Sequence, residues 1–393
     1  MSTKYADKKT KRTTPPSEDS HRKGAAEVIA DLLKSAGIVI NGNNPWDLQV
    51  HNEDFYERVL SDGSLGFGES YMEGWWDCAQ LDEMICRTMV QNLHNRINRN
   101  RKLILRAMKG RFFNLQSLKR AFQVGERHYD IGNDLYRAML DPTMSYSCGY
   151  WKDARDLHQA QLNKLDLLCR KLDLQPGEKL LDIGCGWGSM VQYAAEKYGV
   201  DVTGVTVSKE QKVLAEQRCR KLPVKILLRD YREVTGTFDK VVSVGMFEHV
   251  GPKNYPIFMK TVNRLLEDRG VFLLHSITSQ DTPRHGEPWI DRYIFPNGFT
   301  PSLTQISRAC EPHFIIEDVH NFGPDYDRTL MTWHTNFDHA WPTLQDKYGD
   351  TFYRMWTFYL KGSAGAFRSG EQQLLQLVLR RRWPNRKRFD CPR

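Results

Sequence analysis

The chain has 393 residues, of which 40% are hydrophobic and 26% charged, and its formal net charge is +8. This length favours two domains with a sizeable core. The eight cysteines form no C-x-x-C pair and no zinc-spaced cluster with histidine, and no apolar run approaches the roughly 18 residues of a membrane span. These features argue against a disulfide scaffold, a metal site and an integral membrane protein. We expect a cytoplasmic chain without a secretory signal, either soluble or attached to the inner face of the cell membrane.

The N-terminal quarter divides into two parts. Residues 1–22, rich in Lys, Thr, Ser and Pro, are predicted to form a disordered basic tail. Residues 23–95 are predicted to form a small α+β domain associated with lipid or a membrane. Its patterns predict helices at 25–35 and 55–60, and short strands at 38–40 and 48–50 around an Asn-Gly turn. Trp75 and Trp76 are most simply core residues, with an aromatic surface that meets lipid as the alternative.

Positive charge gathers in two segments. Residues 91–125 contain nine Lys or Arg and no Asp or Glu, with Leu, Met and Phe between them. We predict that residues 96–125 form a basic amphipathic linker attracted to an anionic bilayer, at about 1 kcal/mol per well-placed cation. Nucleic acid is the alternative partner. Residues 380–393 form a second basic segment, a predicted C-terminal tail.

Strand and helix patterns alternate from residue 157 onward. Strands are predicted at 179–183, 201–207, 224–228, 239–245 and 270–277, and helices at 157–171, 190–198, 209–221 and 254–266. Because helices connect successive strands, the strands should be parallel and covered on both faces. We therefore predict an α/β Rossmann-like fold with a mostly parallel, doubly wound sheet in a domain spanning 126–379. Ligands of such sheets bind outside the carboxyl ends of the strands.

The first of these strands runs into a glycine-rich turn, LLDIGCGWGS at residues 180–189. Gly184, Gly186 and Gly188 permit positive φ and a close approach of a ligand, and the next helix points free N–H groups into the turn. Asp182 lies two residues before the first glycine. This G-x-G-x-G pattern is typical of class I methyltransferases that use S-adenosylmethionine (SAM). The alternative is an ordinary strand–helix turn without a ligand.

Polar residues also follow the next two strands. Thr206, Ser208 and Gln211 stand where most methyltransferases place an acid for the ribose, so that contact must be made differently. Asp230 and Tyr231 follow the third strand, where an acid and an aromatic ring can hold adenine. A turn cap is the alternative role for Asp230.

Three residues are candidates for the reacting side of the site. Glu248 follows the fourth strand, His275 lies on the fifth, and Cys148 lies in the loop before the sheet. Each has a plainer alternative role. Glu248 could cap a helix, His275 could be a satisfied core histidine, and Cys148 could be a small buried hydrophobe.

Six motifs in order resemble the cyclopropane-fatty-acyl-phospholipid synthase family: YSCGYW, LDIGCGWG, GVTVSKEQ, SVGMFEHVGPKNY, YIFPNG and NFGPDYDRTLMTW. The resemblance covers residues 25–379 and makes 126–379 the catalytic domain. It implies that the methyl of SAM is transferred to a cis double bond in a membrane phospholipid, and that proton loss then closes a cyclopropane ring. It also implies a homodimer, and we expect no nucleic-acid partner.

The resemblance assigns residues to two ligands. SAM contacts are implied at Tyr146, Ser147, Leu180, Asp182, Gly184, Cys185, Gly186, Gly188, Thr206, Ser208 and Gln211, to which the sheet pattern adds Asp230 and Tyr231. A bicarbonate ion that acts as the base is implied between Cys148, Glu248, His275, Ile277 and Tyr326. Rings that could stabilise the intermediate carbocation belong to Tyr129, Tyr146, Tyr150, Trp151, Tyr293 and Tyr326.

One departure from the family pattern bears on activity. Ser363 stands where some members carry a cysteine in an N-A-C-A-G-A-F motif, so an active protein would not need that thiol. Two other functions stay open. A nucleic-acid methyltransferase shares the fold and charge, but the chain lacks an N-P-P-Y-type motif after the fourth strand. A lipid-binding homologue without catalysis conflicts with the intact Cys148, Glu248, His275 and Tyr326.

Overall fold

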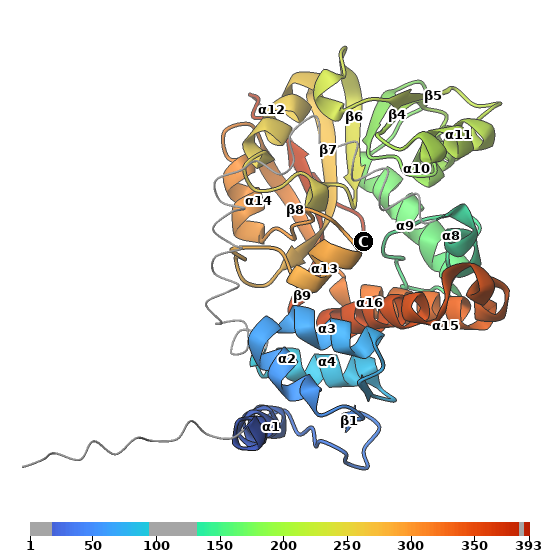
Figure 1. Cartoon of the computed structure of the whole chain (residues 1–393). Coiled ribbons are helices and arrows are strands. Elements are labelled where there is room, and N and C mark those ends of the chain that lie inside the picture. Colours follow the sequence, from blue (N-terminus) through green and yellow to red (C-terminus); the bar gives the residue numbers. More distant parts are fainter. Residues whose placement is uncertain (1–17, 94–131, 385–388) are drawn as a thin grey trace, which may run out of the picture.

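The computed structural model describes residues 18–93, 132–384 and 389–393 (Figure 1). Most of the predicted N-terminal tail and all of the predicted linker at 96–125 lie outside these ranges. Helix α1 (Glu18–Lys34) begins inside the segment 1–22, so its residues 18–22 are helical and do not belong to a disordered tail.

The N-terminal domain is a helical unit around Trp76. Its remaining elements are β1 (Gln49–Val50), α2 (Asp54–Asp62), α3 (Ser64–Met72), β2 (Trp76–Asp77) and α4 (Leu81–Val90). Trp76 is fully buried and its ring stacks on Phe67, with Phe55 and Tyr71 beside it, which confirms that it is a core residue. Residues 64–72 form helix α3, which carries Phe67 and Tyr71 to the Trp76 ring.

Of the two strands predicted at 38–40 and 48–50, the second is present as β1, and the first is not a strand. Ile40 and Leu48 make only a single bridge, and β1 pairs antiparallel with β2 instead. The buried Asp47 carboxylate explains this arrangement. It accepts the backbone N–H groups of Val39 and Asn44, both at 2.8 Å, and so closes the intervening chain into a loop rather than a two-stranded ladder.

The N-terminal domain packs on helix α16 (Asp350–Arg368) through α3 and α4 (Figure 1). A Cβ atom at Gly365 would lie 2.3 Å from the Asp82 carbonyl oxygen, so only glycine allows this approach of the two helices. Ser363 lies in the same stretch of small residues. Nearer the start of α16, Arg354 donates to the Trp76 carbonyl and to Asp77, each at 2.8 Å.

The second domain contains a seven-stranded sheet in the order β5-β4-β3-β6-β7-β9-β8. Its strands are β3 (Lys179–Ile183), β4 (Asp201–Thr206), β5 (Val224–Leu228), β6 (Phe238–Val244), β7 (Leu266–Ser279), β8 (Ile315–Asn321) and β9 (Gln372–Arg380). The first five are parallel, and β9 is antiparallel to both β7 and β8. The predicted mostly parallel, doubly wound sheet is therefore confirmed.

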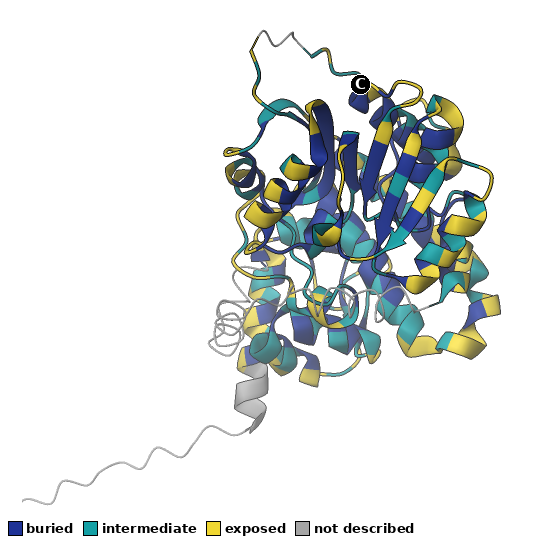
Figure 2. Cartoon of the chain, turned by 90° about the horizontal axis from the view of Figure 1, so that it is seen from above, coloured by how far each residue is buried: buried dark blue, intermediate teal, exposed yellow. Residues whose placement is uncertain are grey.

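Helices surround this sheet. They are α8 (Asn133–Met139), α9 (Leu157–Leu172), α10 (Ser189–Tyr198), α11 (Lys209–Arg218), α12 (Tyr255–Leu265), α13 (Pro288–Tyr293), α14 (Leu303–Cys310) and α15 (Gly323–Tyr348), with short turns η2 (Tyr231–Glu233) and η3 (Phe247–His249). The sheet interior is buried, whereas exposed residues lie on the outer helix faces and loops (Figure 2). Helices α15 and α16 pack against each other beside the carboxyl ends of the parallel strands.

Three arginines of the basic C-terminal segment contact the domain that it follows. Arg381 pairs with Asp268 at 2.8 Å, and Arg393 donates to Asp318 at 2.8 Å. Arg380 is the last residue of β9, and its guanidinium lies over the Trp383 ring. Arg381 and Arg393 are thus paired with acids of the second domain. Among the described residues, no helix is long and apolar enough to cross a membrane.

Candidate functional site

The glycine turn between β3 and α10 has the predicted geometry. Gly184, Gly186 and Gly188 all have positive φ, at 91°, 54° and 91°. A Cβ at Gly184 would meet Met246 at 2.7 Å, and one at Gly188 would meet Ala215 at 3.0 Å. At Gly186, no described atom lies within 4 Å of that position. Two of the glycines thus permit close packing, and the middle one leaves the turn open to a ligand.

Asp182 and Ser147 lie near one buried cation on α9. Asp182 is fully buried, its Oδ1 has no hydrogen-bond partner in the described part of the chain, and burial raises its pKa to about 7 against the opposing charge of Lys164. Lys164 donates from Nζ to Ser147 Oγ at 3.0 Å. The structure therefore brings two of the implied SAM residues to the same edge of the sheet.

The end of β4 is closed by a polar network. Thr206 Oγ1 donates to Gln211 Oε1 at 2.8 Å and accepts from the Ser208 N–H at 3.1 Å. Ser208 caps α11 by accepting the Gln211 N–H. The three residues thus form one preorganised unit at the position where most methyltransferases place an acid.

At the end of β5, Asp230 is engaged by its neighbour. Its carboxylate accepts the backbone N–H of Arg232 at 2.9 Å and two guanidinium N–H groups, each at 2.7 Å. It therefore caps η2, the alternative role that the sequence left open. The following Tyr231 packs edge-on against Phe258, and its pKa is raised by burial.

The loop that carries Tyr146, Ser147 and Cys148 is fixed by two helices. Thr329 of α15 accepts the Gly149 N–H at 3.1 Å and the Trp151 indole N–H at 2.9 Å. Tyr146 shares a hydrogen bond of 2.8 Å with Tyr359 of α16. This loop is therefore held against the C-terminal helices, opposite the sheet edge.

Glu248 lies in η3, which follows the end of β6. Its Oε1 accepts the backbone N–H of Ile277 at 2.7 Å, which ties η3 to the end of β7. Its Oε2 is buried without a hydrogen-bond partner among the described residues. Burial raises the pKa of Glu248 to about 7, although N–H groups, first that of Ile277, favour the ionised form. The carboxyl group can therefore exchange a proton near neutral pH.

His275 on β7 is a neutral imidazole. Burial lowers its pKa well below the ordinary value, and the charges of Lys164 and Lys171 act in the same direction. The Gln376 amide nitrogen lies 3.2 Å from His275 Nδ1. Because an amide nitrogen can only donate, Nδ1 accepts and the ring proton lies on Nε2. Nε2 is buried and has no partner within the described ranges, so it can donate to an incoming group.

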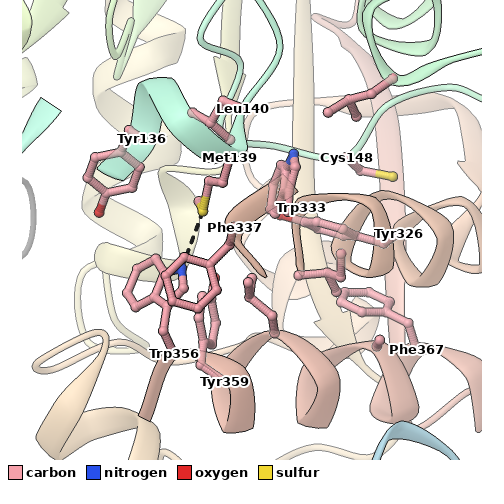
Figure 3. Close-up of a cluster of buried hydrophobic side chains, with 14 of the residues drawn as sticks. Tyr136, Met139, Leu140, Cys148, Tyr326, Trp333, Phe337, Trp356, Tyr359 and Phe367 are labelled. Atoms are coloured by element: carbon pink, nitrogen blue, oxygen red, sulfur yellow. Dashed lines mark hydrogen bonds between the residues drawn. The ribbon is translucent and has the colours of Figure 1, made fainter. Parts of the chain in front are cut away.

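Cys148 and Tyr326 belong to a buried aromatic cluster between the sheet edge and helices α15 and α16 (Figure 3). Burial raises the pKa of Cys148 well above its usual range, so the thiol stays protonated and is a poor nucleophile. Tyr326 packs on Phe367 with ring centroids 4.6 Å apart. Ile277 packs against the same cluster, which links this pair to the Glu248 side.

The described members of the predicted aromatic set gather at this cluster. Tyr150, Trp151 and Tyr326 belong to it, and Tyr146 and Tyr293 pack against it. Tyr293 also donates its hydroxyl to Glu69 of α3 at 2.9 Å, which ties it to the N-terminal domain. Trp151 lies under the Arg328 guanidinium, and Tyr150 packs on Phe322. Tyr129 lies outside the described residues.

Sequence reasoning missed three polar residues that organise the site. Lys164, Thr329 and Gln376 lie within ordinary helix and strand patterns, and each is fully buried or nearly so. The only sign of these residues in the sequence is a polar side chain at a position where the pattern predicts a core residue. That sign does not identify the hydrogen-bond partner, because the partners of Lys164, Thr329 and Gln376 lie 17, 180 and 101 residues away in the chain.

The fold and the site define the class. A sheet of this order, with the glycine turn after β3 and an acid at its strand end, is that of a class I SAM-dependent methyltransferase. Residues 116–377 match the family model described as mycolic acid cyclopropane synthetase. The chain belongs to this family and is an enzyme of SAM-dependent cyclopropane synthesis, as the sequence motifs predicted.

Individual relatives agree with the family match. The chain is 53% identical to the cyclopropane-fatty-acyl-phospholipid synthase of Escherichia coli (strain K12), over 90% of this chain and 93% of that protein. It is 32% identical to the tuberculostearic acid methyltransferase UfaA1 of Mycobacterium tuberculosis, over 92% and 90% of the two chains. A crystal structure of mycolic acid cyclopropane synthase CmaA1 with SAH and CTAB has a TM-score of 0.62 and 34% identity, over 66% of this chain and 97% of that chain.

Proposed function

We propose that this chain converts cis double bonds in the acyl chains of membrane phospholipids into cyclopropane rings, with SAM as the methylene donor. The observation that carries the proposal is the pair of buried groups at neighbouring strand ends. Glu248 Oε2 and His275 Nε2 each lack a hydrogen-bond partner within the described part of the chain. Unpaired buried polar atoms are costly, so their presence together points to a polar group that completes them.

The reaction explains why the site has this composition. An alkene is a weak nucleophile, so it must be held in line with the sulfonium and close to it. Formation of the new C–C bond breaks the S–CH3 bond and leaves a carbocation on the adjacent carbon. The faces of Tyr146 and Tyr326 can stabilise that charge without reacting with it. Loss of a proton from the new methyl group then closes the ring.

We propose that Glu248, His275, Ile277, Cys148 and Tyr326 form a site for bicarbonate. When bound, this ion would supply the base that accepts the proton. The residues present fit such an ion. His275 Nε2 carries a proton to donate, and Glu248, with its pKa near 7, can keep the proton that prevents two anions from repelling each other.

The proposed SAM site lies at the ends of β3, β4 and β5. The glycine turn and Asp182 would contact the amino-acid part, together with Tyr146 and Ser147 of the opposite loop. The unit of Thr206, Ser208 and Gln211 would face the ribose, and Asp230 with Tyr231 the adenine. The open position at Gly186 supports this arrangement.

We further propose that the protein works as a homodimer, peripherally on the inner face of the cell membrane. The N-terminal domain (23–95) and the basic segment 96–125 would meet the anionic bilayer, while 126–379 carries the chemistry. The pairing of Arg381 and Arg393 with acids supports assigning membrane attraction to 96–125 rather than to the C-terminal segment.

The test uses the purified chain, SAM and vesicles of unsaturated phospholipid, with the product analysed by mass spectrometry. We expect one added CH2 and one lost double bond at each modified position. A product that carries a methyl branch and no ring would contradict cyclopropane formation. Methylation of RNA without lipid modification would favour the nucleic-acid alternative, and SAM binding without any product would favour a lipid-binding homologue.

A further inference from the structure

A buried lysine without an ion pair lies behind the proposed SAM site. Lys164 on α9 is 1% exposed, and no described carboxylate lies within ion-pair distance of it. Its one side-chain hydrogen bond among the described residues runs from Nζ to Ser147 Oγ at 3.0 Å. Burying an unpaired cation is costly, so a compensating negative group is expected when the site is complete.

The chemistry of the ammonium group fixes the direction of this hydrogen bond. A protonated lysine has three donors and no acceptor, so Ser147 Oγ must accept. The hydroxyl proton of Ser147 is then available only for a different acceptor. Ser147 is also nearly buried, so water is a poor substitute for that acceptor.

The loop cannot easily turn away from α9. Gln161, one turn before Lys164, donates its amide N–H to the Ser147 carbonyl at 2.7 Å. On the opposite side, Gly149 is held by Thr329. Ser147 is therefore fixed through both its backbone and its side chain, and the hydroxyl proton has a defined direction.

We propose that Lys164 is a positioning residue for the co-substrate: it holds Ser147 as an acceptor, so that the Ser147 O–H donates to the carboxylate of the methionine part of SAM. This inference rests on the proposed SAM contact of Ser147. The carboxylate is the only anionic group of SAM, and it is the group that a buried ammonium selects over the ribose hydroxyls and adenine nitrogens.

The charge state of Lys164 agrees with this role. Burial lowers its pKa to about 8, while the nearby Asp141, Cys148 and Asp182 act in the opposite direction. The lysine is thus mostly charged at pH 7. As the pH rises through 8 it loses its proton, so affinity for a ligand with the carboxylate should fall over that range.

Binding to the full chain tests the proposal without lipid. Isothermal titration at pH 7 with S-adenosylhomocysteine, which carries the carboxylate, is compared with 5′-methylthioadenosine, which lacks the whole amino-acid part. Lys164→Met should weaken S-adenosylhomocysteine binding about tenfold or more and change 5′-methylthioadenosine binding less than about twofold. Ser147→Ala should show the same selective loss, and the double variant should lose no more than either single one.

Lys171→Met is the matched control. Lys171 is a second buried lysine on α9, also with a pKa lowered by burial to about 8, but its Nζ lies 3.0 Å from His320 Nδ1. It should leave S-adenosylhomocysteine affinity unchanged. Equal loss of both ligands in Lys164→Met, or no loss of S-adenosylhomocysteine, would overturn the proposal.

If Lys164→Met does not fold, Ser147→Ala decides alone, and wild-type affinity in that variant would overturn both the lysine role and the Ser147 contact. Failure to form a cyclopropane ring, with the selective binding loss present, would contradict the proposed reaction and leave this inference standing.

Discussion

The two edges of the site differ in how they handle buried charge. The cofactor edge, formed by Asp182, Ser147 and Lys164, contains a fixed ammonium. At the proposed reacting edge, Glu248 accepts the backbone N–H of Ile277 and His275 is a neutral imidazole, and the charges of Lys164 and Lys171 act on His275 without contacting it. Burial raises the pKa of both carboxyl groups to about 7, so burial alone does not distinguish the edges.

The difference follows from what each edge must hold. A co-substrate with a carboxylate gains from a nearby ammonium group that is charged at pH 7. A carbocation would be destabilised by one, because like charges in a low-dielectric site repel strongly. Neutral His275 and a proton-exchanging Glu248 avoid that repulsion and still provide donors for an oxyanion.

The largest expected effect is on turnover in Glu248→Gln. The amide keeps the shape of the side chain but cannot exchange a proton, so we expect turnover to fall by about 10²–10⁴-fold. Binding of S-adenosylhomocysteine should change little, because it occupies the other edge. Ring formation on vesicles and calorimetric titration measure the two quantities. A variant that loses SAH binding as well would show that Glu248 acts at the cofactor edge.

The next effect is on stability against pH. Between pH 4.5 and 7, Glu248 is protonated in the folded state and ionised in the unfolded state. The folded state therefore binds more protons, and its stability falls as pH rises through this window. Glu248→Gln removes the free-energy cost of keeping this carboxyl group buried. Its free energy of unfolding should therefore exceed that of the wild type by up to about 3 kcal/mol between pH 4.5 and 8. Urea unfolding at several pH values measures this, and a difference independent of pH would contradict the raised pKa.

A smaller effect is expected at Gln376. Gln376→Leu removes the donor that holds the His275 proton on Nε2, and turnover should fall about tenfold with the KM for SAM unchanged. Gln376→Glu should be worse, since a carboxylate demands the proton on Nδ1. Gln373→Leu on the same strand is the control, because Gln373 bonds Gln280 and not the histidine. An equal loss of turnover in Gln373→Leu and Gln376→Leu would indicate that either substitution destabilises β9 in general.

The smallest effect concerns the membrane. Replacing Lys and Arg within 96–125 by Gln should weaken binding to anionic vesicles and flatten its dependence on salt. Arg381→Gln and Arg393→Gln should change vesicle binding little, because these side chains already pair with Asp268 and Asp318. Co-sedimentation at several salt concentrations measures both, and a large loss in the C-terminal variants would reassign the membrane contact.

The sequence by itself determined the parallel half of the sheet and the class of chemistry. The predicted strand at 179–183 has the observed bounds of β3, and the glycines of the following turn have the predicted positive φ, because buried strands and glycine turns are local patterns. Ile277 and Tyr326 were predicted as site residues only through the resemblance to the family, because no local pattern in the sequence singles them out.

Tertiary structure decided the rest. The antiparallel strands β8 and β9 and the helix pair α15 and α16 were not assigned, since their pairings span long stretches of chain. The proton on His275 depends on Gln376, and the direction of Ser147 depends on Lys164. The loop at Asp47 also depends on tertiary contacts, because the Asp47 carboxylate accepts the N–H groups of Val39 and Asn44. In each case a buried polar group forms its hydrogen bond with a group that tertiary packing brings next to it. The hydrophobic periodicity of the sequence carries no information about that partner.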